Sequence, residues 1–230
     1  MTRKAVIILS GGMDSTTVAF FAASKGFDLH VLSFSYGQRN VVEVERAKMV
    51  VDGLPSVEEH RIVDINLGCI KGSALTSDIS VPKDAYDNDS DDSVIPVTYV
   101  PGRNTIFLSY ASSFAESIGA CDIFIGANVI DYSNYPDCRP EYLQAMERTI
   151  NLGTKQGVQG QRMKIHAPFL LISKAAIVKK GIELGVDYSK TISCYDPDSH
   201  GRSCGHCDAC IVRKEAFSEN GLSDPIEYYG

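Results

Sequence analysis

The sequence has 230 residues, 44% of them hydrophobic and 22% charged, an ordinary composition for a soluble globular protein of one large or two small domains. A net charge of -7 argues against a surface that holds nucleic acid mainly through its phosphates, and it favours small-molecule substrates. No apolar run approaches the roughly 18 residues of a membrane span, and the run after Lys4 is too short for a secretory signal, so we expect a cytoplasmic protein without a membrane partner.

The first predicted element is a buried strand that ends in a glycine-rich turn. Residues 5–9 are all apolar, as in a parallel strand covered on both faces, and residues 10–17 read SGGMDSTT and open a predicted helix. Glycines allow close approach to a ligand, and the first amides of the helix point at it. The pattern predicts a phosphate site that lacks the Walker A lysine. The alternative is a plain strand-to-helix turn with Asp14 or Ser15 as N-cap.

The next stretch predicts a βαβ unit. The helix after the turn should end near Gly26, and residues 29–34 form a strand parallel to the first. Ligands on such sheets bind beyond the carboxyl ends of the strands, which places residues 34–39 near a nucleotide. Phe34 or Tyr36 could stack on an adenine there, although a plain loop fits this stretch equally well.

An amphipathic helix is predicted over residues 40–52, with Glu43 and Glu45 on its charged face, and a third strand over residues 61–65. Residues 77–93 are polar and acidic with little apolar periodicity, so we expect a mobile loop or lid. Aspartates at alternate positions from 87 to 91 are spaced as in a calcium loop, but the EF-hand glycine and terminal glutamate are absent.

A second anion contact is predicted at residues 100–104, which read VPGRN before an apolar-periodic helix that should end at Gly119. Arg103 in this turn can meet a phosphate bidentately; the alternative is a surface arginine. Residues 122–127 form a further predicted strand, and the loop over 128–140 after it is dense in carboxylate, phenol and guanidinium groups, where substrate should bind. Pro140 fits the first turn of the next helix, over 141–152.

The last predicted elements of the sheet domain are a strand over 163–168 and a helix over 174–184 capped by Ser173. Lys174 opens this helix against the dipole preference, which suggests a nearby anion, although an exposed lysine is at least as compatible.

Four cysteines near the C-terminus predict a metal site: Cys194, Cys204, Cys207 and Cys210. Four thiolates with such gaps can close a tetrahedron around structural zinc, and the rival is an iron–sulfur cluster. Of the other cysteines, Cys69 and Cys121 are expected in the core, and Cys138 is a candidate nucleophile to which no activating group can be assigned.

Taken together, these motifs resemble the 7-cyano-7-deazaguanine synthases, nitrile-forming PP-loop ATP pyrophosphatases of the queuosine precursor pathway. The resemblance runs nearly end to end and rests on SGGMDSTT at 10–17, SYGQR at 35–39, VPGRN at 100–104, DYSNYPDCRPEY at 131–142 and the cysteines followed by DACIVR at 208–213. Other PP-loop ATPases share only the first motif. Asn134 stands where the family has glycine, and one extra residue follows Cys194; neither change threatens the assignment, since Asn also tolerates a left-handed turn.

The resemblance implies conversion of 7-carboxy-7-deazaguanine and ammonia to the 7-nitrile through an adenylated acid and an adenylated amide, with two ATP used. It implies that Mg²⁺ and ATP are held by the first loop, its flanks and two further residues, namely Ile8, Leu9, Ser10, Gly11, Gly12, Met13, Asp14, Ser15, Thr16, Thr17, Val18, Phe34 and Arg103. The implied catalytic residues are Asp14, Ser15, Arg103 and Lys174. The implied substrate contacts are Tyr36, Asp131, Tyr132, Tyr135, Asp137 and Arg139.

The expected fold is a doubly wound α/β domain with a mostly parallel sheet over residues 1–190, resembling the adenine nucleotide alpha hydrolases, followed by a small zinc-binding lobe with a C-terminal helix or tail over 191–230. Because no glutaminase pattern is present, free ammonia is the expected nitrogen source, and the family implies a homodimer. Two rivals remain: a PP-loop enzyme acting on tRNA, such as a lysidine synthase or thiolation enzyme, and a non-catalytic zinc-ribbon binding module. The acidic balance and the missing basic domain argue against the first.

Overall fold

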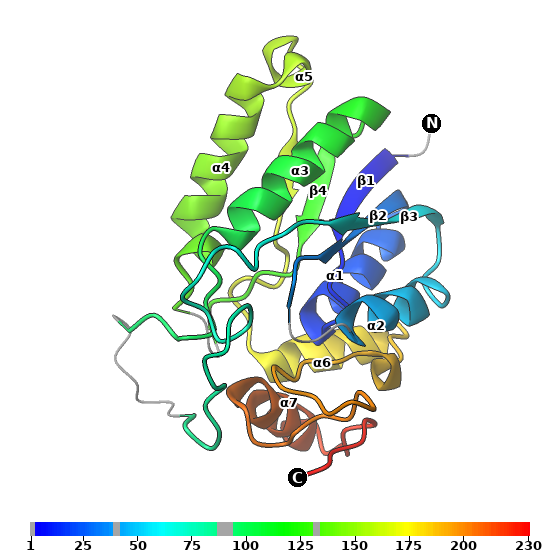
Figure 1. The fold of residues 1–230 in the computed structure, drawn as a ribbon. Coiled ribbons are helices and arrows are strands. Elements are labelled where there is room, and N and C mark those ends of the chain that lie inside the picture. Colours follow the sequence, from blue (N-terminus) through cyan, green and yellow to red (C-terminus); the bar gives the residue numbers. More distant parts are fainter. Residues whose placement is uncertain (1–2, 39–41, 87–93, 131–133) are drawn as a thin grey trace.

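The computed structural model describes residues 3–38, 42–86, 94–130 and 134–230. Its centre is one sheet of five strands in the order β3-β2-β1-β4-β5, and all four strand pairs are parallel. The strands are β1 (Arg3–Ile8), β2 (Phe27–Ser35), β3 (Val57–Asp64), β4 (Asp122–Ile125) and β5 (Lys164–His166) (Figure 1). The chain winds outward from β1 to β3 and then returns to the other side of β1, which confirms the predicted doubly wound class.

The helices are α1 (Met13–Ser24), α2 (Val42–Val51), α3 (Arg103–Ile118), α4 (Pro140–Gly153), α5 (Lys155–Val158), α6 (Lys174–Glu183) and α7 (Asp208–Glu219), with 3₁₀ turns η1 (Pro136–Cys138) and η2 (Tyr188–Lys190). Each long helix predicted from the apolar periodicity is present. Helix α5 and both 3₁₀ turns were not predicted, because elements of three or four residues carry too few positions to show a period. Strand β3 begins four residues before its predicted start.

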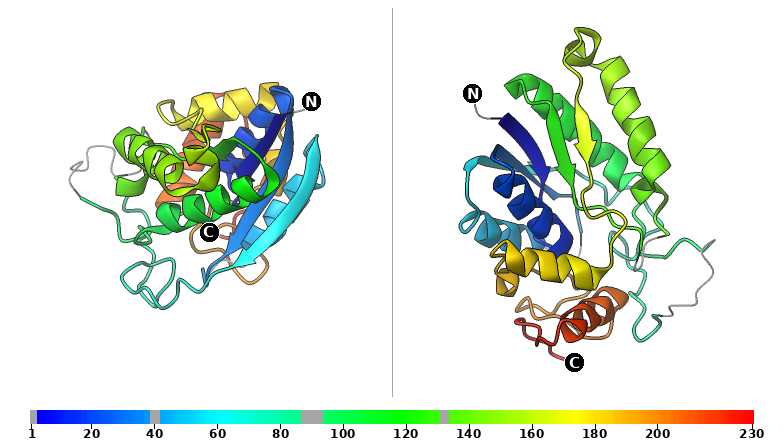
Figure 2. Two further views of the ribbon diagram at one scale, coloured as in Figure 1. Left: turned by 90° about the horizontal axis from the view of Figure 1, so that it is seen from above. Right: turned by 180° about the vertical axis from the view of Figure 1, so that it is seen from behind.

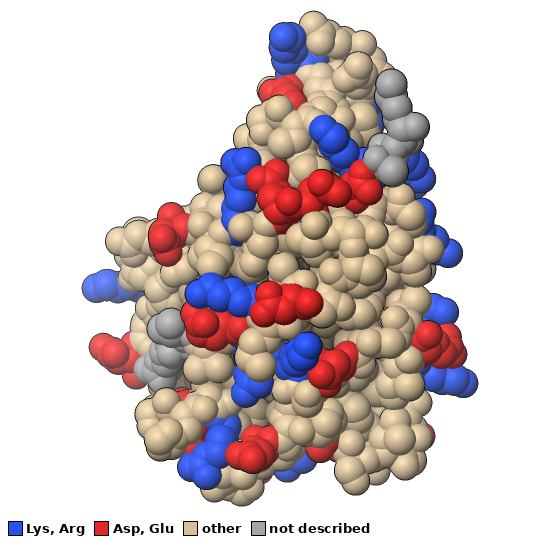
Figure 3. All heavy atoms as spheres, turned by 90° about the vertical axis from the view of Figure 1, so that its right-hand side faces the viewer, with Lys and Arg blue, Asp and Glu red and all other residues tan. Residues whose placement is uncertain are grey.

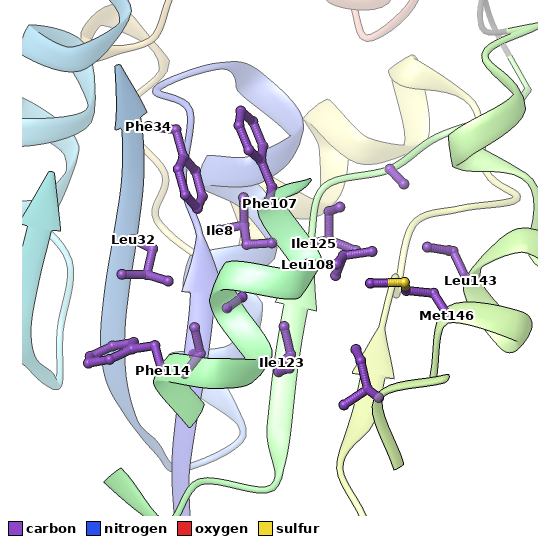
Figure 4. Packing of buried hydrophobic residues seen from close by; sticks show 14 of the residues in the cluster. Ile8, Leu32, Phe34, Phe107, Leu108, Phe114, Ile123, Ile125, Leu143 and Met146 are labelled. Carbon is purple, nitrogen blue, oxygen red and sulfur yellow. The ribbon is translucent and has the colours of Figure 1, made fainter. Parts of the chain in front are cut away.

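Helices cover both faces of the sheet (Figure 2). Alternate residues of β1 point to opposite faces, so Val6 and Ile8 join the cluster with α3 and α4, while Ala5 and Ile7 join the cluster with α1, α2 and α6. On the first face, the rings of Phe34 and Phe107 stack with centroids 4.0 Å apart (Figure 4). This two-sided burial explains why the sequence of β1 reads as a continuous apolar run.

The C-terminal segment packs against the α/β layers. Phe217 of α7 lies in one buried cluster with Met13 of α1 and Val178 of α6, and Figure 1 shows α7 beside α6. Asn220 donates to the carbonyl of Ala175, joining the end of α7 to α6. The predicted domain boundary after residue 190 stays a prediction.

The surface shows mixed charge on the side of β3 and α2. Basic and acidic side chains are interspersed there (Figure 3), and pairs such as Arg61 with Glu59 and Lys48 with Glu45 account for part of the mixture. Within the described ranges, no helix combines the length and the apolar character that crossing a membrane requires.

Candidate functional site

A cavity of ≈ 250 Å³ lies at the carboxyl ends of β1, β2 and β4, where ligands of doubly wound sheets bind. Residues from the C-terminal segment, including Ser193 and Val212, form part of its wall. The polar and charged side chains that line it are Ser10, Asp14, Ser15, Tyr36, Glu43, Arg103, Asn104, Asn128, Tyr135, Cys138, Lys174, Ser193, Tyr195 and Arg213.

The turn between β1 and α1 is shaped by close backbone packing. Gly11 has φ +82°, and a Cβ there would lie 2.6 Å from the carbonyl oxygen of Glu43. A Cβ on Gly126, after β4, would lie 2.7 Å from the amide nitrogen of Ser15. The glycine turn therefore packs against α2 and the first turn of α1 packs against the end of β4, which holds the first amides of the helix at the cavity.

Two serine hydroxyls of this turn hydrogen-bond to each other. The Oγ atoms of Ser10 and Ser15 are 3.0 Å apart, and the amide of Gly12 donates to Ser10 Oγ. Gly12 is the N-cap residue of α1 and no side chain caps this helix, so the alternative prediction of Asp14 or Ser15 as N-cap is wrong. The hydroxyls lie beside the first amides of the helix, a suitable arrangement for phosphate oxygens.

The predicted loop residues fall into two groups. Ile8, Leu9, Ser10, Gly12, Met13, Asp14 and Ser15 line the cavity. Gly11, Thr16, Thr17 and Val18 are not in its lining: Thr17 donates to the Met13 carbonyl and is 2.7 Å from the Tyr188 hydroxyl, and Val18 is 1% exposed in the core. The last part of the motif thus anchors α1 behind the cavity.

Asp14 and Lys174, 160 positions apart in the chain, form an ion pair at the cavity. Lys174 Nζ donates to Asp14 Oδ2. The other oxygen, Oδ1, is buried and has no hydrogen-bond partner in the part of the chain that the structure describes. A buried carboxylate oxygen without a partner suits a hard cation such as Mg²⁺, which prefers oxygen ligands.

Arg103 opens α3 and reaches the same cavity. Its Nη1 donates to the hydroxyl of Tyr36 over 3.4 Å, and burial raises the pKa of Tyr36 to about 12, so this phenol stays neutral at physiological pH. Phe34 also lines the cavity, but it stacks on Phe107 within the protein. One face of the predicted adenine-stacking ring is therefore already covered.

Glu43 was missed by the sequence reasoning, which placed it on the charged outer face of α2. It lines the cavity instead, hydrogen-bonded by Gln38, and burial raises its pKa to about 7. The prediction failed because the first turn of α2 lies at the end of the sheet, whereas the apolar periodicity of this helix reflects the later turns that pack on the sheet. Its place in the first turn after a strand end is the signal that could have found it.

The predicted substrate contacts in the loop after β4 fall into two groups. Tyr135 lines the cavity, its hydroxyl lies 2.7 Å from that of Thr98, and burial raises its pKa. Asp137 and Arg139 do not line it: Asp137 accepts a hydrogen bond from the Asn104 amide and thereby caps α3, and Arg139 is exposed. Burial also raises the pKa of Asp137.

Asp131 and Tyr132 lie outside the described residues, as does part of the predicted acidic lid, residues 87–93. Among the remaining cysteines, Cys138 lines the cavity and accepts a hydrogen bond from Asn104 Nδ2 over 3.4 Å. Cys69 is exposed, so its predicted core position is wrong, and Cys121 is partly buried.

The four predicted metal ligands come together. The sulfur atoms of Cys194, Cys204, Cys207 and Cys210 all lie within 4.8 Å of one another and all four residues are buried. A tetrahedral ion with sulfur at about 2.3 Å places its ligands about 3.8 Å apart, close to the 3.5 Å between the sulfurs of Cys207 and Cys210 and the 4.0 Å between those of Cys204 and Cys210. The group can hold a single metal ion.

Backbone amides support these sulfurs. The amides of Asp196 and Cys204 donate to Cys194 Sγ, and those of His206 and Cys207 donate to Cys204 Sγ. Such donors stabilise negative charge on sulfur, as the thiolate form of a metal ligand requires.

Arg213, also missed as a site residue, connects this metal-ligand group to the cavity. It lies on α7, which begins directly after Cys207, and its side chain is 0% exposed, paired with Asp224 over 2.7 Å. Its guanidinium also donates to the Thr191 hydroxyl and the Tyr188 carbonyl. Its place at the end of the DACIVR stretch, three residues after Cys210, is the signal that could have found it.

The family model and the curated relatives agree with each other over nearly the whole chain. Residues 4–221 match the family described as "Queuosine biosynthesis protein QueC". The chain is 54% identical to the 7-cyano-7-deazaguanine synthase of Kineococcus radiotolerans over 100% of both chains, and 52% identical to that of Paramagnetospirillum magneticum over 98% of this chain and 99% of the relative. A solved structure of NMN synthetase from Francisella tularensis is 17% identical, with a TM-score of 0.49 over 96% of this chain and 79% of that one. The chain therefore belongs to the queuosine biosynthesis protein QueC family.

Proposed function

We propose that this protein converts 7-carboxy-7-deazaguanine, ammonia and ATP to 7-cyano-7-deazaguanine. Relatives that bear the name of this activity match the chain from end to end. The single observation that carries the ATP-dependent chemistry is the arrangement at the start of α1, where free helix amides, the Asp14–Lys174 pair and Arg103 surround one cavity.

The proposed reaction makes a poor electrophile reactive in two stages. A carboxylate oxygen of the substrate attacks the α-phosphorus of ATP and pyrophosphate leaves, which gives an acyl adenylate with a good leaving group. Ammonia then forms the amide and releases AMP. A second ATP adenylates the amide oxygen, and loss of AMP and a proton leaves the nitrile.

Residues of the first loop hold the phosphates in this proposal. The amides at the start of α1 and the hydroxyls of Ser10 and Ser15 donate to phosphate oxygens, and Lys174 and Arg103 stabilise negative charge as pyrophosphate leaves. Mg²⁺, when bound, neutralises part of the triphosphate charge, and Asp14 Oδ1 is its proposed ligand.

The substrate base binds in the part of the cavity next to Tyr36 and Tyr135, whose rings can pack against it. Asp131, Tyr132, Asp137 and Arg139 remain proposed contacts, and the last two would have to reach the base from outside the present cavity lining.

Zinc is the proposed occupant of the four-cysteine group, since sulfurs this close suit one tetrahedral ion and closed sets of four thiolates are structural. Its proposed task is to hold the start of α7, and with it Arg213, against the cavity. We further propose a cytoplasmic homodimer that takes free ammonia and does not bind nucleic acid; the resemblance supports the dimer, and the acidic balance supports the lack of nucleic acid.

Mass spectrometry of a reaction with MgATP, ammonium and 7-carboxy-7-deazaguanine tests the proposal. The expected products are the nitrile, AMP and pyrophosphate, with two AMP per nitrile. AMP without nitrile would retain adenylation and replace the acceptor by tRNA or another acid, and binding of labelled tRNA to a filter would then distinguish these. Absence of any ATP turnover would favour the non-catalytic zinc-ribbon module.

A further inference from the structure

Glu43 is a carboxylate on the cavity wall that the proposed scheme does not use. It lies in the first turn of α2, and the backbone of this turn packs directly on the phosphate-binding loop: a Cβ on Gly11 would lie 2.6 Å from the carbonyl oxygen of Glu43. The side chain shares one cavity with Ser10, Asp14 and Arg103. It therefore stands beside the site where an adenylate would form.

Gln38 fixes the position of this carboxylate. The Gln38 side chain is buried, its Oε1 accepts from the amide of Tyr36 over 2.7 Å, and its Nε2 donates to the carbonyl of Phe34 over 3.3 Å. It also donates to Glu43. With both ends of its amide held by backbone groups of Phe34 and Tyr36, Gln38 directs a hydrogen at Glu43.

Pairing with Arg103 is the alternative role for Glu43, because Arg103 faces it and favours the charged carboxylate. Pairing with Arg103 by itself would lower the pKa of Glu43 below its ordinary value. Burial outweighs Arg103 and raises the pKa of Glu43 to about 7, so the carboxylate can both accept and release a proton near physiological pH.

Other titratable groups around this cavity come from several elements. Tyr36 at the end of β2 faces Glu43 with a pKa raised to about 12, so it does not compete for protons at neutral pH. The remaining ones on the cavity wall are Asp14 of α1, Lys174 of α6, Tyr135, Cys138, Tyr195 and Arg213 of α7. Asp14 is already paired with Lys174.

We propose that Glu43 is the proton acceptor of the ammonia-dependent step. This inference rests on the proposed function and assigns it a residue. Ammonia attacking an adenylate becomes positively charged at nitrogen, and the amide cannot form until that nitrogen loses a proton. A partly buried carboxylate beside the adenylate meets this need, and the cations Lys174 and Arg103 do not.

In the proposed step, Glu43 accepts the proton that ammonia loses as the amide forms. The lone pair of ammonia forms the C–N bond to the acyl carbon, while the carbonyl π pair moves to oxygen. One N–H proton passes to the Glu43 carboxylate and its bonding pair stays on nitrogen. The oxygen pair re-forms C=O and breaks the C–O bond to AMP, which leaves amide, AMP and protonated Glu43; the proton returns to solvent as products leave.

The test separates the two half-reactions in Glu43→Gln. Exchange of labelled pyrophosphate into ATP, dependent on 7-carboxy-7-deazaguanine and measured without ammonia, should stay near the wild-type rate. Ammonia-dependent amide and nitrile formation should fall about 10²- to 10⁴-fold, the usual contribution of a positioned base. Rates divided by free ammonia concentration should drop about tenfold per pH unit below the pKa of the base in wild type, and this limb should vanish in the variant.

Two further variants serve as controls. Glu45→Gln changes an exposed residue of the same helix, paired with Lys48, and should leave both half-reactions unchanged. Glu43→Asp should restore part of the rate and keep an acidic limb. An unchanged ammonia step in Glu43→Gln would overturn the inference. Pyrophosphate exchange reduced as much as the whole reaction would also overturn it, and would indicate that Glu43 acts by pairing with Arg103. If the wild-type protein showed no pyrophosphate exchange that depends on 7-carboxy-7-deazaguanine, the proposed function would be refuted, and the inference with it.

Discussion

Breaking the ion pair between Arg213 and Asp224 on one side should strongly destabilise the C-terminal segment. Both side chains are buried, 0% and 6% exposed, and they meet bidentately, with Arg213 Nε donating to Asp224 Oδ2 over 2.7 Å and Nη2 donating to Oδ1 over 3.0 Å. The hydroxyl of Tyr228 donates to the same carboxylate over 2.6 Å. Changing Asp224→Asn removes the negative charge without removing volume and leaves the guanidinium buried without its partner.

The expected loss follows from breaking a buried pair on one side, which costs about 3 to 5 kcal/mol. At about 2 to 4 °C per kcal/mol for a chain of this size, the melting temperature should fall by about 6 to 20 °C. Differential scanning calorimetry and urea unfolding, both with zinc in the buffer, measure this change. Glu183→Gln is the matched control, since it alters an exposed pair with Lys180 and should leave the melting temperature unchanged.

A double variant, Arg213→Met with Asp224→Leu, checks the reasoning. Replacing both charges by apolar side chains removes the uncompensated charge, so it should be more stable than Asp224→Asn. The Tyr188 carbonyl would keep a donor, because the Thr191 amide also donates to it. A loss below about 1 kcal/mol in Asp224→Asn, or a double variant no more stable than the single one, would refute the reasoning that an uncompensated buried charge destabilises the variant.

Gly126→Ala should place a Cβ against Ser15, which should cost about 1 to 3 kcal/mol in urea unfolding and weaken ATP binding in calorimetry. The control Gly153→Ala, with open space around its Cβ, should leave both quantities unchanged. Cys210→Ser should lose the metal in elemental analysis and lower the melting temperature. Arg103→Ala should slow pyrophosphate exchange and weaken ATP binding; unchanged values would exclude its phosphate role. Glu43 has a raised pKa, so its favourable contribution is complete below pH 4.5 and is lost as pH rises through about 7; relative to Glu43→Gln, the apo wild type should lose up to about 3 kcal/mol of unfolding free energy over that interval.

Much of the fold could be predicted because each local pattern agreed with its burial. The run in β1 is apolar throughout since helices cover both faces of the sheet, and the periodicity of α3 matches the cluster around Phe107 and Phe114. The four-cysteine group was also predictable, because the short spacings among Cys204, Cys207 and Cys210 already limit how far apart their sulfurs can lie.

Side-chain direction at the site could not be predicted in the same way. Asp137 stands in a polar loop beside Tyr135, yet it turns inward to cap α3 while Tyr135 faces the cavity. Thr17 belongs to the glycine-rich motif, yet its hydroxyl bonds to Tyr188 behind α1. In a loop or a helix end, the direction of a side chain depends on partners distant in sequence, and no period reports it.

The sequence by itself determined the order of the strands and long helices, the glycine-rich turn and the grouping of four cysteines, because these depend on local periodicity, glycine conformation and short spacings. Only the tertiary structure decided which charges share the cavity. Asp14 meets Lys174 across 160 positions, and Glu43 and Arg213 reach the same wall from α2 and α7. These meetings follow from how the helices pack at the carboxyl edge of the sheet, where contacts join residues that are far apart along the chain.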